Sequence, residues 1–212
     1  MMAAKWWSNF PEKIAAAYEL SERFGMPLFE DGRPVAYDGP PSPCIPNVGR
    51  LLAALAAATK PEGLLGEMGT ACGVGCAWMS QGMGADARLI SAELDPAMAH
   101  AAADLFEDDP RIEIGAGDWH AILPPAGPFD LLFLDSGVRE ELQPANWGYF
   151  TELVKVGGIL FMDDLVPMHL RPPEWTGEVD LKREFAFKNS RVQSVEVLST
   201  NLSAALIITR IA

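Results

Sequence analysis

The fold is decided by one short stretch, residues 64–75, which reads LLGEMGTACGVG. It begins as a short apolar strand, and its glycines let the backbone turn tightly and approach a ligand closely. The helix predicted next, Val74–Gln81, presents free N–H groups to an anionic group such as a carboxylate. The spacing Gly69-x-x-x-Gly73-x-Gly75 differs from the G-x-G-x-x-G of dinucleotide-binding proteins, and a purely structural strand-to-helix turn is the alternative.

Strands and helices alternate along the chain on the C-terminal side of this stretch. Apolar runs predict strands at Leu64–Met68, Arg88–Leu94, Arg111–Ile114, Phe129–Leu134 and Gly158–Met162. Helical patterns lie between them, at Val74–Gln81, Pro96–Phe106 and Trp147–Val154. Two β-rich runs at the end, Val192–Leu198 and Ala204–Ile211, predict a hairpin. We therefore expect an α/β fold with a doubly wound, mostly parallel sheet and a C-terminal antiparallel hairpin.

The N-terminal side of the deciding stretch has a different character. Apolar residues predict helices at 11–24 and 48–59, and five prolines between residues 34 and 46 predict a loop. A length of 212 residues fits one domain. We expect a single domain, 1–212, with an N-terminal segment, 1–46, and a core, 47–212. The aromatic start of the segment suits either a lid or a homodimer interface.

Composition excludes several classes of protein. The chain has 16 Lys and Arg against 29 Asp and Glu, and its net charge of −13 disfavours proteins that bind nucleic acid or an anionic membrane surface. We find no apolar run long enough to span a bilayer and no signal-peptide pattern. Three cysteines, Cys44, Cys72 and Cys76, are too few for a disulfide framework, so we expect a reduced, cytoplasmic protein.

Acidic residues follow the second and third predicted strands, at the sheet edge where such folds bind ligands. Glu93 ends the second strand, and its two oxygens suit the two hydroxyls of a ribose. Asp118 follows the third strand, where a carboxylate can accept from an adenine amino group while Trp119 stacks on the ring. The alternatives are a solvated acid before a helix cap for Glu93 and plain core packing for Trp119.

Three more acids follow the fourth and fifth strands. Asp135 comes directly after Phe129–Leu134, and Asp163 and Asp164 come directly after Gly158–Met162. Carboxylates at neighbouring strand ends resemble a site for a hard cation such as Mg²⁺. Because consecutive side chains of a strand point to opposite faces, the doublet needs a turn beginning at Asp163. Capping of the next turn, or pairing with an arginine, is the alternative for Asp163 and Asp164.

Taken together, these motifs resemble a known family. The stretches GEMGTACGVG, DARLISAELDP, FDLLFLD and GGILFMDD occur in the order typical of class I S-adenosylmethionine-dependent methyltransferases, and of the catechol and caffeoyl-CoA O-methyltransferase group in particular. The resemblance covers residues 45–164, and the closing hairpin also fits. It implies a Rossmann-like, seven-stranded sheet with helices on both faces. It also implies transfer of a methyl group from S-adenosylmethionine to a hydroxyl of a small molecule.

The resemblance also implies roles for individual residues. Those assigned to the cofactor are Ile45, Glu67, Gly69, Thr70, Gly73, Glu93, Asp118, Trp119 and Asp135. Those assigned to a divalent cation, Mg²⁺ or another, are Asp135, Asp163 and Asp164, with Asp164 where the family usually has Asn. Three further positions depart from the family pattern: Gly75 replaces a hydroxyl residue, Gly137 an aromatic residue, and Val138 the lysine thought to act as base.

The departures leave the acceptor chemistry open. Asp135 would act in catalysis through the cation, and His169, in the irregular loop predicted over 165–190, is our candidate base, with His120 second. Two alternatives remain: a methyltransferase-like protein that binds cofactor without catalysis, and an NAD-linked oxidoreductase, which the glycine spacing opposes. A methyltransferase acting on nucleic acid is a minor alternative that the acidic charge disfavours.

Overall fold

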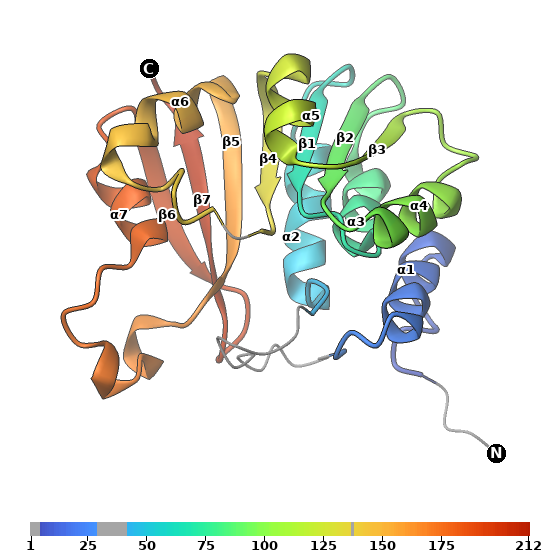
Figure 1. Cartoon of the computed structure of the whole chain (residues 1–212), viewed down its shortest axis with the longest axis horizontal. Coiled ribbons are helices and arrows are strands. Elements are labelled where there is room, and N and C mark those ends of the chain that lie inside the picture. The colour runs from blue at the N-terminus through green and yellow to red at the C-terminus, as the bar shows by residue number, and fades with distance from the viewer. Residues whose placement is uncertain (1–4, 29–41, 137) are drawn as a thin grey trace.

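One mixed sheet forms the centre of the molecule (Figure 1). The computed structural model describes residues 5–28, 42–136 and 138–212, and the strands in these ranges are β1 (Leu64–Met68), β2 (Arg88–Glu93), β3 (Ile112–Ala116), β4 (Phe129–Leu134), β5 (Val154–Leu165), β6 (Val192–Leu198) and β7 (Ala204–Arg210). Their order across the sheet is β3-β2-β1-β4-β5-β7-β6. Strands β1 to β5 pair in parallel, whereas β7 pairs antiparallel with β5 and with β6. The predicted doubly wound sheet and its C-terminal hairpin are confirmed.

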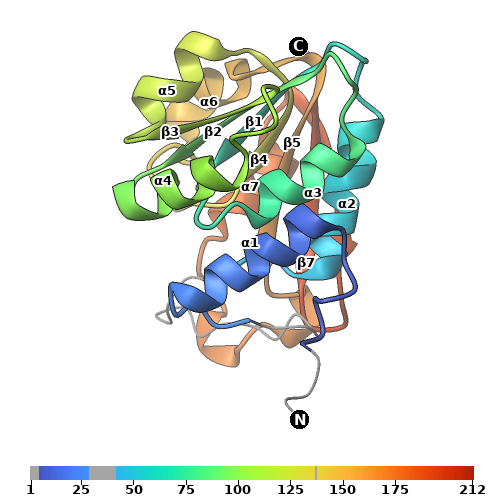
Figure 2. The ribbon, with the colours of Figure 1, turned by 90° about the vertical axis from the view of Figure 1, so that its right-hand side faces the viewer.

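Helices cover both faces of the sheet (Figure 2). They are α1 (Glu12–Arg23), α2 (Pro46–Ala57), α3 (Val74–Gly82), α4 (Pro96–Leu105), α5 (Trp119–Ala126), α6 (Trp147–Glu152) and α7 (Leu181–Lys188), with short 3₁₀ helices η1 (Pro144–Asn146), η2 (Met168–Leu170) and η3 (Pro173–Trp175). Helices α1, α2 and α3 pack into one core cluster, and α5, α6 and α7 pack into a second one. The point between β1 and β4, where the order of strands across the sheet reverses, therefore lies between two helical layers, as the predicted architecture requires.

Strand β4 shows why these residues form a central strand. Leu131 and Phe133 pack into the first core cluster, and Leu132 and Leu134 pack into the second, and all four are fully buried. Burying one such side chain contributes about 1.5–3 kcal/mol, so an apolar strand gains most where both of its faces are covered. Asp135 then leaves the strand at a point where the apolar run ends.

The N-terminal aromatic residues belong to this core. Trp7 is buried, and its ring lies 6.3 Å from that of Tyr18 on α1. The ring of Phe10 lies 5.4 Å from that of Trp78 on α3. These contacts are made within one chain, so the start of the protein contributes to the fold itself. Most of the proline-rich loop falls on residues 29–41, outside the described residues, and the roles proposed for 1–46 as lid or dimer interface stay predictions.

Two helices were missed by the sequence analysis. The prediction of an irregular loop over 165–190 is wrong for Leu181–Lys188, which forms α7; the Asp180 side chain accepts a hydrogen bond from the Arg183 N–H and so caps this helix. Helix α5 begins after Asp118, which caps it in the same way, and holds two consecutive prolines near its end. Both helices are only 8 residues long, so caps and core contacts decide them more than a long periodic pattern does.

Candidate active site

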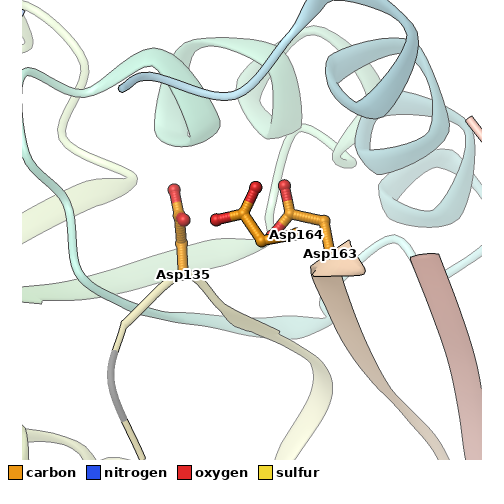
Figure 3. Close-up of side chains that lie close together, drawn as sticks. All are labelled: Asp135, Asp163 and Asp164. Atoms are coloured by element: carbon orange, nitrogen blue, oxygen red, sulfur yellow. The ribbon is translucent and has the colours of Figure 1, made fainter. Parts of the chain in front are cut away.

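Three carboxylates come together at the carboxyl ends of β4 and β5. One oxygen from each of Asp135, Asp163 and Asp164 lies within 4.8 Å of the others. Figure 3 shows the three side chains pointing toward a common space. Asp163 is buried, Asp135 is half-buried and Asp164 is exposed, so the group opens to solvent on one side. The sequence-predicted metal ligands therefore form one cluster, which we call the acid cluster.

A bulge in β5 turns both aspartates of the doublet to one side. The predicted turn at Asp163 is wrong, because β5 continues to Leu165. Instead, the register against β7 shifts between Met162 and Leu165, and Asp164 adopts a left-handed backbone with φ of 58°. An inserted residue locally breaks the alternation of side chains along a strand. A bulge within the strand, rather than a turn at its end, thus brings the side chains of Asp163 and Asp164 to the same side.

The electrostatics of the acid cluster fit a divalent cation. Burial, and secondarily the charges of neighbouring carboxylates, raise the pKa of both Asp135 and Asp163 well above their usual range. Among the described residues, Asp163 Oδ1 is buried without a hydrogen-bond partner. A buried carboxylate oxygen without a partner is costly, and an ion such as Mg²⁺, which takes oxygen ligands, would supply one. The residues present therefore suit this kind of ion.

The glycine turn after β1 lies directly against the acid cluster. The N–H groups of Gly69 and Thr70 both donate to the Ala92 carbonyl of β2, which fixes the turn to the sheet. Gly69 has a φ of 91°, and a Cβ atom added there would lie 2.2 Å from the Asp135 carbonyl oxygen. Glycine is required at this position by both its backbone conformation and the close approach. The turn and Asp135 are thereby held in contact.

Glu67 is the most deeply buried acid next to the turn. Its Oε2 accepts hydrogen bonds from Ser91 Oγ at 2.6 Å and from Cys76 Sγ at 2.8 Å. Burial raises the pKa of Glu67 from 4.5 to about 7. A Cβ atom on Gly75 would lie 2.0 Å from Glu67 Oε1, which explains why this chain has glycine where the family has a hydroxyl residue. Cys76 therefore does more than pack, since it also holds this carboxyl group.

Glu93, the predicted ribose ligand, is fixed by the backbone on both sides. Its Oε2 accepts from the Ala71 N–H at 2.7 Å, and its Oε1 accepts from the Asp95 N–H at 2.9 Å. Each carboxylate oxygen keeps a further lone pair that can accept from a hydroxyl group. Glu93 thus links the glycine turn to the end of β2 and presents a carboxylate of fixed orientation beside both.

The third predicted strand end is organised around His120. Its Nδ1 lies 2.7 Å from Asp118 Oδ1, and its Nε2 lies 3.0 Å from Glu141 Oε1. The Trp119 ring stacks on the imidazole with centroids 3.7 Å apart and also packs against the second core cluster. Because carboxylates engage both ring nitrogens, His120 is a poor candidate for the base. Asp118 caps α5 in addition to any contact with adenine.

Other predicted residues lie outside the acid cluster. His169 is exposed on η2 and is not a member of the carboxylate group, and Ile45 is half-buried at the start of α2. Val138, at the family's lysine position, is 3% exposed and packs in the second core cluster, while position 137 lies outside the described residues. The sequence analysis missed Lys182, whose Nζ donates to the Asp163 carbonyl oxygen at 2.6 Å. Its place on an unpredicted helix gave no sequence signal for this contact.

Comparison of the sequence with known proteins finds methyltransferases. Residues 67–165 match a family described as a methyltransferase domain. A catechol O-methyltransferase from Niastella koreensis is 30% identical over 129 residues. The match covers 57% of this chain and 57% of the relative, so the chain spans little more than half the length of the curated relative it matches.

Solved structures extend the likeness to nearly the whole chain. An O-methyltransferase from Bacillus cereus in complex with SAH has a TM-score of 0.66 at 17% identity, covering 96% of this chain and 93% of that one. The O-methyltransferase TomG from Streptomyces achromogenes, in complex with SAM, has a TM-score of 0.67 at 20% identity, covering 95% and 91%. At these identities the likeness establishes the fold.

The chain therefore shares its fold, a mostly parallel seven-stranded sheet with a C-terminal antiparallel pair, with these solved O-methyltransferase structures. The relatives and structural neighbours named above are themselves O-methyltransferases, the class that the sequence motifs resemble. Among the described residues, no helix combines the length and the apolar character needed to cross a bilayer.

Proposed function

We propose that this protein is an S-adenosylmethionine-dependent O-methyltransferase that acts on a hydroxyl group of a small molecule. The close approach between Gly69 and Asp135 carries the proposal. It holds the glycine turn, expected to shape the methionine pocket, in direct contact with the acid cluster, expected to receive the acceptor. On this proposal, the cofactor would bind on one side of the contact between Gly69 and Asp135, and the acceptor would react on the other.

The chain's own residues would bind and orient the cofactor. Glu93 would accept from both ribose hydroxyls, and the N-terminus of α3 would offer free N–H groups to the methionine carboxylate. Trp119 and Asp118 would border the adenine, and Ile45 and Thr70 would complete the pocket. When bound, the cofactor supplies a methyl group on an electrophilic sulfonium. The enzyme's main task is then to align the acceptor oxygen in line with that methyl group.

The acid cluster would hold a divalent cation such as Mg²⁺ through Asp135, Asp163 and Asp164. The ion, when bound, stabilises an acceptor oxygen in its deprotonated form. Val138 is buried in the core and has no titratable group, so the family's usual lysine base is replaced by a side chain that cannot act as a base. His169, which is exposed on η2, stays our candidate for removing the acceptor proton.

Titration calorimetry tests the cofactor part of the proposal. Wild-type protein should bind S-adenosylhomocysteine, and the E93Q variant should bind it more weakly. Matched titrations with NAD should show no binding. Tight binding of NAD without binding of S-adenosylhomocysteine would refute the proposal and favour an oxidoreductase.

A turnover assay distinguishes an enzyme from a cofactor-binding protein without catalysis. The assay follows transfer of labelled methyl from S-adenosylmethionine to a panel of phenols and catechols, with and without Mg²⁺. Methyl transfer to a hydroxyl group supports the proposal. Cofactor binding with no transfer to any acceptor, with or without Mg²⁺, supports the alternative of a cofactor-binding protein without catalysis, which the replacement of the family's lysine by Val138 favours. A homodimer and a cytoplasmic location remain parts of the proposal that sedimentation and fractionation would test.

A further inference from the structure

The bulge that orients the acid cluster lies just beyond the part of β5 that pairs with β4, and it interrupts the pairing of β5 with β7. Strand β4 pairs with β5 up to Met162, and β7 pairs with Met162 and then with Leu165. Asp163 and Asp164 therefore have no paired residue on either neighbouring strand. Asp164 also carries the cost of a left-handed backbone, a conformation that residues other than glycine rarely adopt. Such a conformation persists only where its surroundings hold it.

Two consecutive side chains of α7 contact the backbone on both sides of the bulge. Lys182 Nζ donates to the Asp163 carbonyl oxygen at 2.6 Å, and Arg183 Nη2 donates to the Val166 carbonyl oxygen at 2.9 Å. The two carbonyl groups bracket Asp164. These hydrogen bonds come from charged donors, which are stronger than neutral ones.

Helix α7 is itself firmly anchored. Its residue Phe185 is fully buried in the second core cluster, with its ring 5.5 Å from that of Phe150. Arg183 also donates to both carboxylate oxygens of Glu196 on β6, at 2.8 and 2.6 Å. A helix tied to the core and to the sheet in this way gives Lys182 a fixed origin from which to hold the bulge.

We propose that Lys182 is a positioning residue for the acid cluster: through the Asp163 carbonyl it holds the bulge that aims Asp163 and Asp164 at the same ion. The proposal rests on the proposed function in that it takes the acid cluster to be a cation site. Side chains that orient metal ligands without touching the metal contribute about 10–100-fold to metal affinity. Lys182 meets that description, since it contacts the backbone of a ligand rather than the ion.

A second possible role of Lys182, that of a counter-charge to the carboxylates, predicts the opposite effect on cation binding. The positive charge of Lys182 also acts on the carboxylates of Asp135 and Asp163, and a counter-charge alone would compete with a divalent cation. Loss of Lys182 would then strengthen cation binding. Positioning predicts the reverse, so the sign of the change in affinity decides between the two roles.

The experiment measures Mn²⁺ affinity by electron paramagnetic resonance, which distinguishes free from bound ion without any turnover. K182M removes the donor and the charge at similar length, K182R keeps both, and K188M is the matched control on the same helix, where Lys188 pairs with Glu184. We expect K182M to bind Mn²⁺ at least about tenfold more weakly than wild type. K182R and K188M should stay within about threefold of wild type.

Each result has a defined meaning. Unchanged or tighter binding by K182M overturns the positioning role, and tighter binding assigns Lys182 to the counter-charge role. Weak binding by K182R as well as K182M also overturns it, because the conservative variant keeps the donor. Absence of Mn²⁺ binding by folded wild-type protein refutes the cation site itself, which is a failure of the metal part of the proposed function and is distinguishable from a failure of the role of Lys182. Circular dichroism on each variant confirms that the compared proteins are folded.

Discussion

Replacing Glu67 with glutamine should change how the stability of the protein depends on pH. The Glu67 carboxyl group is buried, accepts from Ser91 and Cys76 through Oε2, and has its pKa raised from 4.5 to about 7, chiefly by burial. The unfolded chain releases this proton near pH 4.5, whereas the folded protein keeps it until about pH 7. Rising pH therefore favours the unfolded chain across this interval, and the stabilising effect of the bound proton is lost as pH rises through 7.

The magnitude follows from the two pKa values. A difference from 4.5 to about 7 corresponds to about 3 kcal/mol of unfolding free energy, at about 1.4 kcal/mol per tenfold change in proton affinity. About 2.5 kcal/mol of this change falls between pH 5 and pH 8. Glutamine does not titrate, so E67Q should gain stability relative to wild type by about this amount over that range.

Urea denaturation at several pH values between 5 and 8 measures the effect. The quantity to compare is the difference in unfolding free energy between E67Q and wild type. The contributions of Asp135 and Asp163 are present in both proteins and largely cancel in this difference. The fixed cost of packing an amide in place of the carboxyl group is independent of pH and does not enter the slope. E113Q, at an exposed residue of β3 that pairs with Arg88, is the control and should run parallel to wild type. A stability difference between E67Q and wild type that stays constant from pH 5 to pH 8 would refute the reasoning.

Three further predictions follow from contacts in the structure. G69A should lose about 3 kcal/mol or more in urea denaturation, whereas G25A, with positive φ but open space around it, should lose only about 1 kcal/mol; equal losses would contradict the close approach to Asp135. W7A should lose about 3 kcal/mol of stability, measured by thermal unfolding, because Trp7 is a buried core residue; an unchanged melting temperature would instead favour a lid. E93Q should weaken S-adenosylhomocysteine binding about tenfold in calorimetry while leaving Mn²⁺ binding unchanged, and a parallel loss of both would indicate a general structural defect.

The sheet and the meeting of the acids were predictable because local patterns encode them. Every residue of Phe129–Leu134 except Asp130 is apolar, so the strand has apolar side chains on both faces. This pattern marks a central strand that is covered on both sides, which is what the structure contains. Parallel strands end at one edge, so acids placed after successive strands come together without any need to know side-chain detail. Glu93 and Asp135 were placed at this edge by that reasoning alone.

The parts of the site that escaped prediction depend on contacts between distant segments. A strand pattern places neighbouring side chains on opposite faces, and only the left-handed backbone of Asp164 reverses this. The charged partner of Asp163 comes from Lys182, 19 residues later, on a short helix whose polar first turn has little apolar periodicity. Helix α5 was missed because two prolines near its end are typical of loops, while the Asp118 cap and the buried Leu123 stabilise the helix.

The departures from the family pattern have unequal consequences for chemistry. Gly75 is accounted for by the oxygen of Glu67 that lies against it, so the effect of this difference stays local to Glu67. Val138 lies in the core, where no titratable group replaces the family's lysine, so the acceptor's own acidity becomes more important. A phenolic hydroxyl ionises near pH 10 in water, and a divalent cation that binds its oxygen lowers the pKa of the hydroxyl, which makes it a stronger acid. An aliphatic alcohol is a far weaker acid and would depend more strongly on a protein base, for which the family's lysine is replaced and only the exposed His169 is proposed. Within the proposed function, the buried valine therefore favours phenolic acceptors held beside the acid cluster over aliphatic ones.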